Sequence, residues 1–152
     1  MQARLASPGD RAEVARLIAG FRDYYGEELP SDETILSVVE RLLEDPATDV
    51  LLAGEPPCGI AQLRYRLSVW TGSDDAWLED LFVEPGRQRA GIGRALLEAA
   101  VARARDRGCA RVQLDVNERN ETALSLYRSL GFETGSPRRW DGGRDLYLTR
   151  WL

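Results

Sequence analysis

Histidine is absent from the 152 residues of this chain, and its absence excludes several kinds of chemistry. There can be no histidine-based catalytic triad, no histidine metal ligand and no histidine general base. Acid–base catalysis would have to use carboxylates, tyrosines, backbone groups or water. Cysteine is scarce as well, because Cys58 and Cys109 make neither a disulfide framework nor a metal-binding set. We expect two reduced thiols that pack in the interior, and we expect no metal site.

Long apolar runs and excess positive charge are also missing. No apolar stretch approaches the roughly 20 residues of a membrane helix. Because no apolar segment follows Met1, we expect no signal peptide. The net charge of −5 disfavours nucleic-acid binding, because proteins of that class are usually basic. A charged fraction of 30% and an ordinary apolar content indicate a globular protein. We therefore expect one cytoplasmic domain over residues 1–152, with neither membrane nor nucleic acid as partner.

Apolar spacing and turn residues predict alternating strands and helices. Capping residues and helical spacing predict helices that begin near Ser7, Ser31, Gly91 and Asn120. Strands are expected over residues 1–5, 49–53, 59–69, 77–83, 110–116, 132–134 and 145–151. This order implies an α/β sheet with helices on both faces. The crossover from the fourth to the fifth strand should be parallel and right-handed.

Period-two alternation assigns the side chains of the two central strands to faces of the sheet. In the strand over 59–69, one face is expected to carry Ala61, Leu63, Tyr65 and Leu67, and the other Gln62, Arg64 and Arg66. In the strand over 77–83, one face is expected to carry Leu78, Asp80 and Phe82, and the other Trp77, Glu79, Leu81 and Val83.

A glycine-rich segment, Gln88-Arg89-Ala90-Gly91-Ile92-Gly93, lies between an expected strand and an expected helix. Glycines let the backbone approach a ligand, and a helix N-terminus offers unpaired N–H donors, so the junction suits a phosphate or pyrophosphate. The spacing excludes the phosphate-binding pattern G-x-x-x-x-G-K-[ST]. A dinucleotide-binding G-x-G-x-x-G loop would lack its third glycine, but Asp115 stands at a suitable distance, so that alternative stays open.

A second motif, N-x-x-A-x-x-L-Y-x-x-x-G-F, occupies residues 120–132, one helix and one strand after Q-x-x-G-x-G at residues 88–93. The two motifs in this order resemble the GNAT superfamily of N-acetyltransferases, and the resemblance spans essentially the whole chain. It implies a single-domain GNAT fold with a mixed, mostly antiparallel sheet, acetyl-CoA as cosubstrate and a homodimer. The segments W-x-G at 70–72 and L-E-D-L-F-V at 78–83 look like the diamine (spermidine/spermine-type) branch.

The resemblance implies that acetyl-CoA lies along one strand end and the glycine-rich loop. The backbone of residues 81–83 would pair with the pantetheine arm, and N–H groups of residues 89–94 would bind the pyrophosphate. The full set of implied acetyl-CoA contacts is Leu81, Phe82, Val83, Gln88, Arg89, Ala90, Gly91, Ile92, Gly93, Arg94, Asn120, Ala123 and Tyr127.

Two side chains are candidates for the proton transfers of acetyl transfer. A primary amine is almost fully protonated at pH 7, so a base or a water chain must remove a proton. Glu79 is the preferred base, acting through water, and Asp80 is its competitor; a salt bridge is the alternative role of Glu79. The matching motif implies that Tyr127 protonates the leaving thiolate, although a tyrosine on an amphipathic helix commonly packs on a sheet.

The acceptor is expected to be a primary amine of a small molecule. Tyr24, Tyr25, Glu27 and Glu28 resemble the aromatic-acidic segment of the diamine branch, and carboxylates with aromatic faces suit a cation. A diamine or polyamine, thialysine, an amino acid and an aminoglycoside would all fit.

The chain also departs from the diamine branch. Arg138, Arg139 and Trp140 stand after the final turn, where that branch has acidic residues, and Arg64 and Arg66 add positive charge near the expected acceptor side. Two other functions stay open, acetylation of a protein or peptide and acyl-CoA sensing without catalysis.

Overall fold

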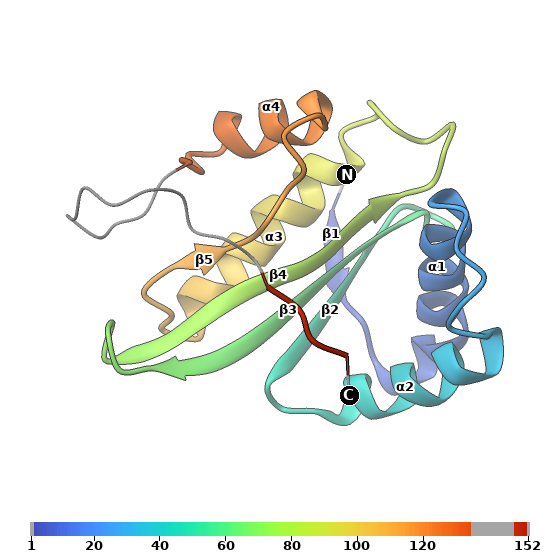
Figure 1. Ribbon diagram of the computed structural model, residues 1–152, viewed down its shortest axis with the longest axis horizontal. Coiled ribbons are helices and arrows are strands. Elements are labelled where there is room, and N and C mark those ends of the chain that lie inside the picture. The colour runs from blue at the N-terminus through green and yellow to red at the C-terminus, as the bar shows by residue number, and fades with distance from the viewer. Residues whose placement is uncertain (1, 135–147, 152) are drawn as a thin grey trace.

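The computed structural model describes residues 2–134 and 148–151. Within these residues, five strands form one mixed sheet in the order β1-β2-β3-β4-β5 (Figure 1). The strands are β1 (Ala3–Leu5), β2 (Thr48–Ala53), β3 (Gly59–Ser68), β4 (Ser73–Val83) and β5 (Val112–Gln113). Neighbours pair antiparallel except β4 and β5, which are parallel. The expected mixed, mostly antiparallel α/β sheet is confirmed.

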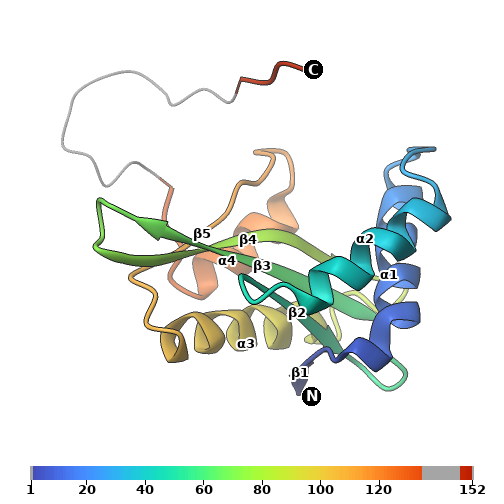
Figure 2. The ribbon, with the colours of Figure 1, turned by 90° about the horizontal axis from the view of Figure 1, so that it is seen from below.

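Helices cover both faces of this sheet, as Figure 2 shows with α3 on one side and α1 and α2 on the other. The helices are α1 (Arg11–Tyr24), α2 (Asp32–Glu44), α3 (Ile92–Asp106) and α4 (Glu121–Ser129), with a short 3-10 helix, η1 (Pro8–Asp10), before α1. The helix expected from Ser7 therefore starts with one 3-10 turn. Strand β2 is buried along its whole length, because helices cover both its faces.

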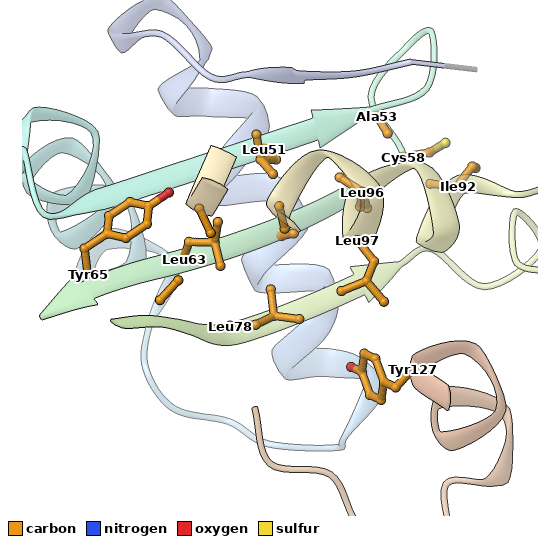
Figure 3. Close-up of a cluster of buried hydrophobic side chains, with 14 residues drawn as sticks. Leu51, Ala53, Cys58, Leu63, Tyr65, Leu78, Ile92, Leu96, Leu97 and Tyr127 are labelled. Carbon is orange, nitrogen blue, oxygen red and sulfur yellow. The ribbon is translucent and has the colours of Figure 1, made fainter. Parts of the chain in front are cut away.

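Two hydrophobic clusters fill the space between sheet and helices. The α3-face cluster joins α3 and α4 to the sheet, and its buried members include Leu51, Leu63, Tyr65, Leu78, Leu96, Leu97 and Tyr127 (Figure 3). The α1-face cluster joins α1 and α2 to Val50, Leu52, Ile60 and Phe82. The expected shared face is confirmed for Ala61, Leu63 and Tyr65, which all belong to the α3-face cluster, whereas Leu67 is exposed.

The face assignment expected for β4 is wrong in one respect. Leu78 packs in the α3-face cluster, whereas Phe82 packs in the α1-face cluster. Gln62 lies opposite Asp80 and Leu63 lies opposite Leu78, so Glu79 has no partner of its own on β3. This β-bulge inserts one residue into β4 and inverts the alternation of faces beyond it.

The last strands differ from expectation. β5 covers only Val112–Gln113 of the expected 110–116, because β4 and the chain after β5 diverge beyond that pair. Residues 132–134 and 148–151 are not in strands, and residues 145–147 lie outside the described residues. At residue 132 the backbone N–H instead closes α4, as described below.

Candidate active site

The site is built around the separation of β4 from β5. These strands pair only at Ala76↔Val112 and Trp77↔Gln113. From Leu78 to Val83, β4 keeps its pairing with β3 but has no partner on its β5 side among the described residues. Backbone N–H and C=O groups along this edge are therefore available to an extended ligand, in the way that a peptide adds to a sheet edge.

A cavity of about 420 Å³ opens beside this edge. Its walls come from α1, the end of β4, the loop before α3, and the start of α4. Predicted residues that line it are Tyr24, Tyr25, Leu81, Phe82, Val83, Gln88, Arg89, Gly91, Gly93, Arg94, Asn120 and Ala123. The structure thus brings together most of the residues that the sequence motifs single out. Phe21, Thr122 and Leu126 also line the cavity. Helical spacing from Tyr24 and Ala123 could have found Phe21 and Leu126, whereas no sequence signal singles out Thr122.

The loop before α3 is held in a conformation suited to an anion. Gly91 is the N-cap of α3 with φ 82°, a left-handed conformation in which glycine is unstrained. Arg89 also has a positive φ, 64°, which is uncommon for a residue with a Cβ. The Gln88 side-chain amide donates a 3.3 Å hydrogen bond to the Val83 carbonyl and ties the loop to β4. The free N–H groups at the start of α3, with the Arg89 and Arg94 guanidiniums, suit a pyrophosphate.

Two of the residues predicted to contact acetyl-CoA through the loop do not present their side chains to the cavity. Ile92 is buried in the α3-face cluster, so only its backbone could face a ligand, and Ala90 does not line the cavity. Gly93 lies where α3 meets α4, since a Cβ built there would lie 3.4 Å from Leu126 Cδ2. A 2.8 Å hydrogen bond from Arg94 Nη2 to Ser129 Oγ joins the same helices.

The end of α4 fixes Tyr127. Gly131, with φ 86°, follows the helix, and the Phe132 N–H donates to the Tyr127 carbonyl while the Gly131 N–H donates to Arg128. This pair of bonds is a Schellman motif, and the rings of Tyr127 and Phe132 lie 5.9 Å apart beside it. The final G-F of the second motif therefore closes the helix that carries the tyrosine.

Tyr127 is buried, and its ring points from α4 toward β4 (Figure 3). Burial raises the pKa of its phenol, and the charges of Asp115 and Tyr25 add to the effect. The phenol is therefore protonated at neutral pH and can act as an acid. Tyr127 lines a second cavity of about 470 Å³ together with Asp115, Val116 and Leu124, and it is not among the residues that line the first cavity.

The two candidate carboxylates flank the bulge in different environments. The Glu79 side chain is 45% exposed and accepts a 3.2 Å hydrogen bond from Gln62 Nε2. Asp80 is half-buried, and burial, assisted by the negative charges of Glu79 and Asp115, raises its pKa to about 6. A carboxylate with such a pKa can exchange protons near neutral pH. The sequence indicated Glu79 as the candidate general base, whereas the environment of the two carboxylates favours Asp80 for that role.

An aromatic group forms the wall opposite the loop. Phe21 stacks on Phe82 at 5.1 Å, and Tyr24 lies 6.2 Å from the same ring. Arg22 anchors the segment that follows α1, since its Nη1 donates 2.7 Å hydrogen bonds to the Pro30 carbonyl and to Asp32.

Other predicted residues lie away from this wall or outside the described part of the chain. Glu27 and Glu28 are exposed between α1 and α2, and neither of the two cavities described above is lined by them. Arg138, Arg139 and Trp140 lie outside the described residues.

In residues 2–134 and 148–151, no group of acidic and cysteine side chains is arranged to hold a metal ion. Cys58 and Cys109 are both free thiols. In the same part of the chain, no helix combines the length and the apolar character that crossing a membrane requires.

Residues 14–132 match the model of the acetyltransferase (GNAT) family. This chain belongs to the GNAT acetyltransferases. It is 32% identical to the thialysine N-epsilon-acetyltransferase of Bos taurus, with 84% of this chain and 81% of the relative covered. It is 33% identical to aminoglycoside N(6')-acetyltransferase type 1 of Stenotrophomonas maltophilia, with 86% and 84% covered.

Among solved structures, a protein of Arthrobacter sp. FB24, provisionally described as an acetyltransferase, superposes with a TM-score of 0.87. The two chains are 35% identical, and the match covers all of this chain and 96% of the other. The GNAT fold expected from the two motifs is therefore confirmed for this chain.

Proposed function

We propose that this GNAT acetyltransferase moves the acetyl group of acetyl-CoA to a primary amine of a small molecule, directly, in a ternary complex. The observation that carries the proposal is the cavity of about 420 Å³, in which the free edge of β4, the start of α3 and the aromatic residues of α1 meet. A cosubstrate with a polar pyrophosphate and an extended arm matches the first two parts, and an amine matches the third.

Acetyl-CoA supplies an activated thioester, and the chain's own groups hold it. The pyrophosphate binds the N–H groups of residues 91–94 with Arg89 and Arg94, and the pantetheine arm pairs with the backbone of residues 81–83. Asn120 caps α4 by accepting a 3.1 Å hydrogen bond from the Ala123 N–H, so its contribution is to orient the start of that helix. Support comes from the cavity, whose lining includes all of these elements.

The transfer requires two proton movements. Asp80, with Glu79 beside it, accepts the proton that the ammonium must lose, through water, because the pKa of Asp80 lies near 6. The amine nitrogen then bonds to the thioester carbonyl carbon, the carbon–sulfur bond breaks, and the sulfur takes the Tyr127 phenol proton. The nitrogen gives its second proton to water, which returns a proton to the Tyr127 phenolate, and Asp80 releases its own proton to solvent. The raised pKa of Tyr127 supports this assignment, since the phenol is protonated before each turnover.

The acceptor is a small molecule because the relatives that cover most of the chain act on thialysine and on aminoglycosides. A homodimer and a cytoplasmic location stay predictions from the sequence.

The test is acetyl-CoA turnover, followed as free thiol, against diamines, polyamines, thialysine, amino acids, aminoglycosides and short peptides. We expect turnover with at least one small amine. Turnover with peptides alone would overturn the small-molecule acceptor. Calorimetric binding of acetyl-CoA without turnover on any amine would favour a sensor.

A further inference from the structure

Two arginines of β3, Arg64 and Arg66, differ from the two arginines that bind buried carboxylates. Arg103 Nε donates a 2.8 Å hydrogen bond to the buried Asp49, and Arg111 Nε donates a 2.9 Å hydrogen bond to the buried Asp75. Among the described residues, Arg64 and Arg66 make no such hydrogen bond. Arg64 has carboxylates only at 3.7 and 3.8 Å, from Asp45 and Glu79.

Arg64 and Arg66 lie in one row on β3. They alternate with the buried Leu63 and Tyr65, so they point to the face opposite α3, as does Gln62. Arg66 is exposed, and its guanidinium lies 5.7 Å from the centroid of the Trp77 ring. Since Gln62 binds Glu79, the row runs from the carboxylates toward the β3–β4 turn.

We propose that Arg64 and Arg66 form a subsite for a carboxylate carried by the acceptor, so that the acceptor is an ω-amino acid rather than a diamine or polyamine. The inference rests on the proposed function. It specifies the charge of the end of the acceptor that does not react.

The spacing along the strand fits such a molecule. Residues two apart on one face of a strand are separated by about 7 Å, so Arg64 lies about 7 Å and Arg66 about 13 Å beyond Gln62. In a lysine-like molecule, about six bonds, or roughly 7 Å, separate the terminal nitrogen from the carboxylate carbon. The Arg64 guanidinium lies 3.8 Å from Glu79, so an ammonium beside Asp80 places the carboxylate of a lysine-like molecule on the far side of Arg64, toward Arg66.

The positive charges along the row also favour an acceptor with a carboxylate over a diamine. Guanidiniums bind carboxylates through paired N–H donors, and an aromatic ring beneath a guanidinium restricts its orientation. The second ammonium of a diamine would meet the same two positive charges and would be repelled. Arg64 and Arg66 are therefore specificity-determining residues, and neither moves a proton in the transfer.

The experiment compares acceptors that differ only by the carboxylate, lysine against cadaverine and thialysine against its decarboxylated diamine. In the unaltered protein we expect kcat/KM to favour each amino acid over its diamine. In Arg66→Gln this ratio should fall about tenfold, and in Arg64→Gln at least as far. Arg105→Gln, which removes the same charge from an exposed position on α3, should leave the ratio unchanged.

The outcomes separate the two levels of the proposal. Turnover that favours the diamines, or a ratio unchanged in both Arg66→Gln and Arg64→Gln, would overturn the carboxylate subsite and leave the acetyltransferase intact. Turnover on neither member of a pair but on other carboxylate-free amines would do the same. A variant that only destabilises the fold would lower both kcat/KM values together, and the ratio would not move.

Discussion

Gln62 donates a hydrogen bond to Glu79, although its backbone lies opposite Asp80. The side chain reaches past its own register partner because the bulge leaves Glu79 unpaired on β3. This contact holds Glu79 at the exposed side of the bulge, whereas burial, with the charges of Glu79 and Asp115, raises the pKa of Asp80. The proposed roles of the two carboxylates follow from this difference in environment.

Asp80→Asn should lower kcat about 10²-fold or more, the range lost when a general base is removed. In the unaltered protein, kcat/KM should rise with pH through about 6, as Asp80 becomes ionised. That step should be absent from the pH profile of Asp80→Asn. Glu79→Gln is the matched control: it should keep the step and move it to lower pH, because a neighbouring negative charge is removed. If Glu79→Gln abolishes the step, Glu79 is the base.

Asp80→Asn should also change stability in the opposite sense from activity. The pKa of Asp80 is raised in the folded state from about 4 to about 6, so the folded protein binds the proton more tightly than the unfolded chain. Its stability therefore falls as pH rises from about 4 to about 6. At pH 7 the variant should be more stable by at most about 3 kcal/mol, and below pH 4 the difference should vanish. Urea unfolding at pH 3.5, 5 and 7 measures this; an equal difference at all three values would contradict it.

Tyr127→Phe should lower kcat at least tenfold and leave the calorimetric affinity for acetyl-CoA within a factor of about two, because only a proton donor is lost. Tyr65→Phe is the matched control at the far end of the same cluster (Figure 3). The Tyr65 hydroxyl donates a 2.7 Å hydrogen bond to buried Asp49, so its loss should cost about 1–2 kcal/mol of stability and leave kcat unchanged. Normal turnover by Tyr127→Phe would show that water alone supplies the proton.

Gly59→Ala should destabilise the protein by about 1–3 kcal/mol, because a Cβ there would lie 2.5 Å from Ile92 Cγ2 and 3.0 Å from Leu96 Cδ1. Ile92 is the first residue of α3, so the displacement should also weaken acetyl-CoA binding, measured by calorimetry. Gly9→Ala is the control, since a Cβ there meets only Ser7 Oγ at 3.6 Å. If acetyl-CoA binding were weakened equally in Gly59→Ala and Gly9→Ala, the packing of Gly59 against Ile92 would not be what positions the loop before α3.

Regular patterns made much of this fold predictable. The uninterrupted apolar run of β2, the Ser31 and Asn120 caps and both motifs appear in the structure where the sequence places them. The bulge escaped prediction because the inserted residue, Glu79, is itself compatible with an alternating strand. The short length of β5 was not predicted because the strand propensity of residues 110–116 does not depend on where the neighbouring strand β4 lies.

The candidate site was predictable in composition and less so in environment. Loop and helix residues such as Gly91 and Asn120 are fixed by local motifs, and they line the cavity. The raised pKa of Asp80 depends first on burial and then on the charges of Glu79 and Asp115; both its burial and the approach of Asp115, 35 positions further along the chain, arise only through the fold. A local sequence pattern therefore could not have predicted the raised pKa of Asp80.

The bulge lets one strand supply side chains to both hydrophobic clusters. Glu79 is the inserted residue, so deleting it would join Leu78 to Asp80 and leave both residues paired with β3 and on their present faces. Deleting any other single residue between Leu78 and Val83, with the bulge kept, would turn one end of the strand over. Position 79 is therefore the place where this strand tolerates a change of length, with the loss of one carboxylate.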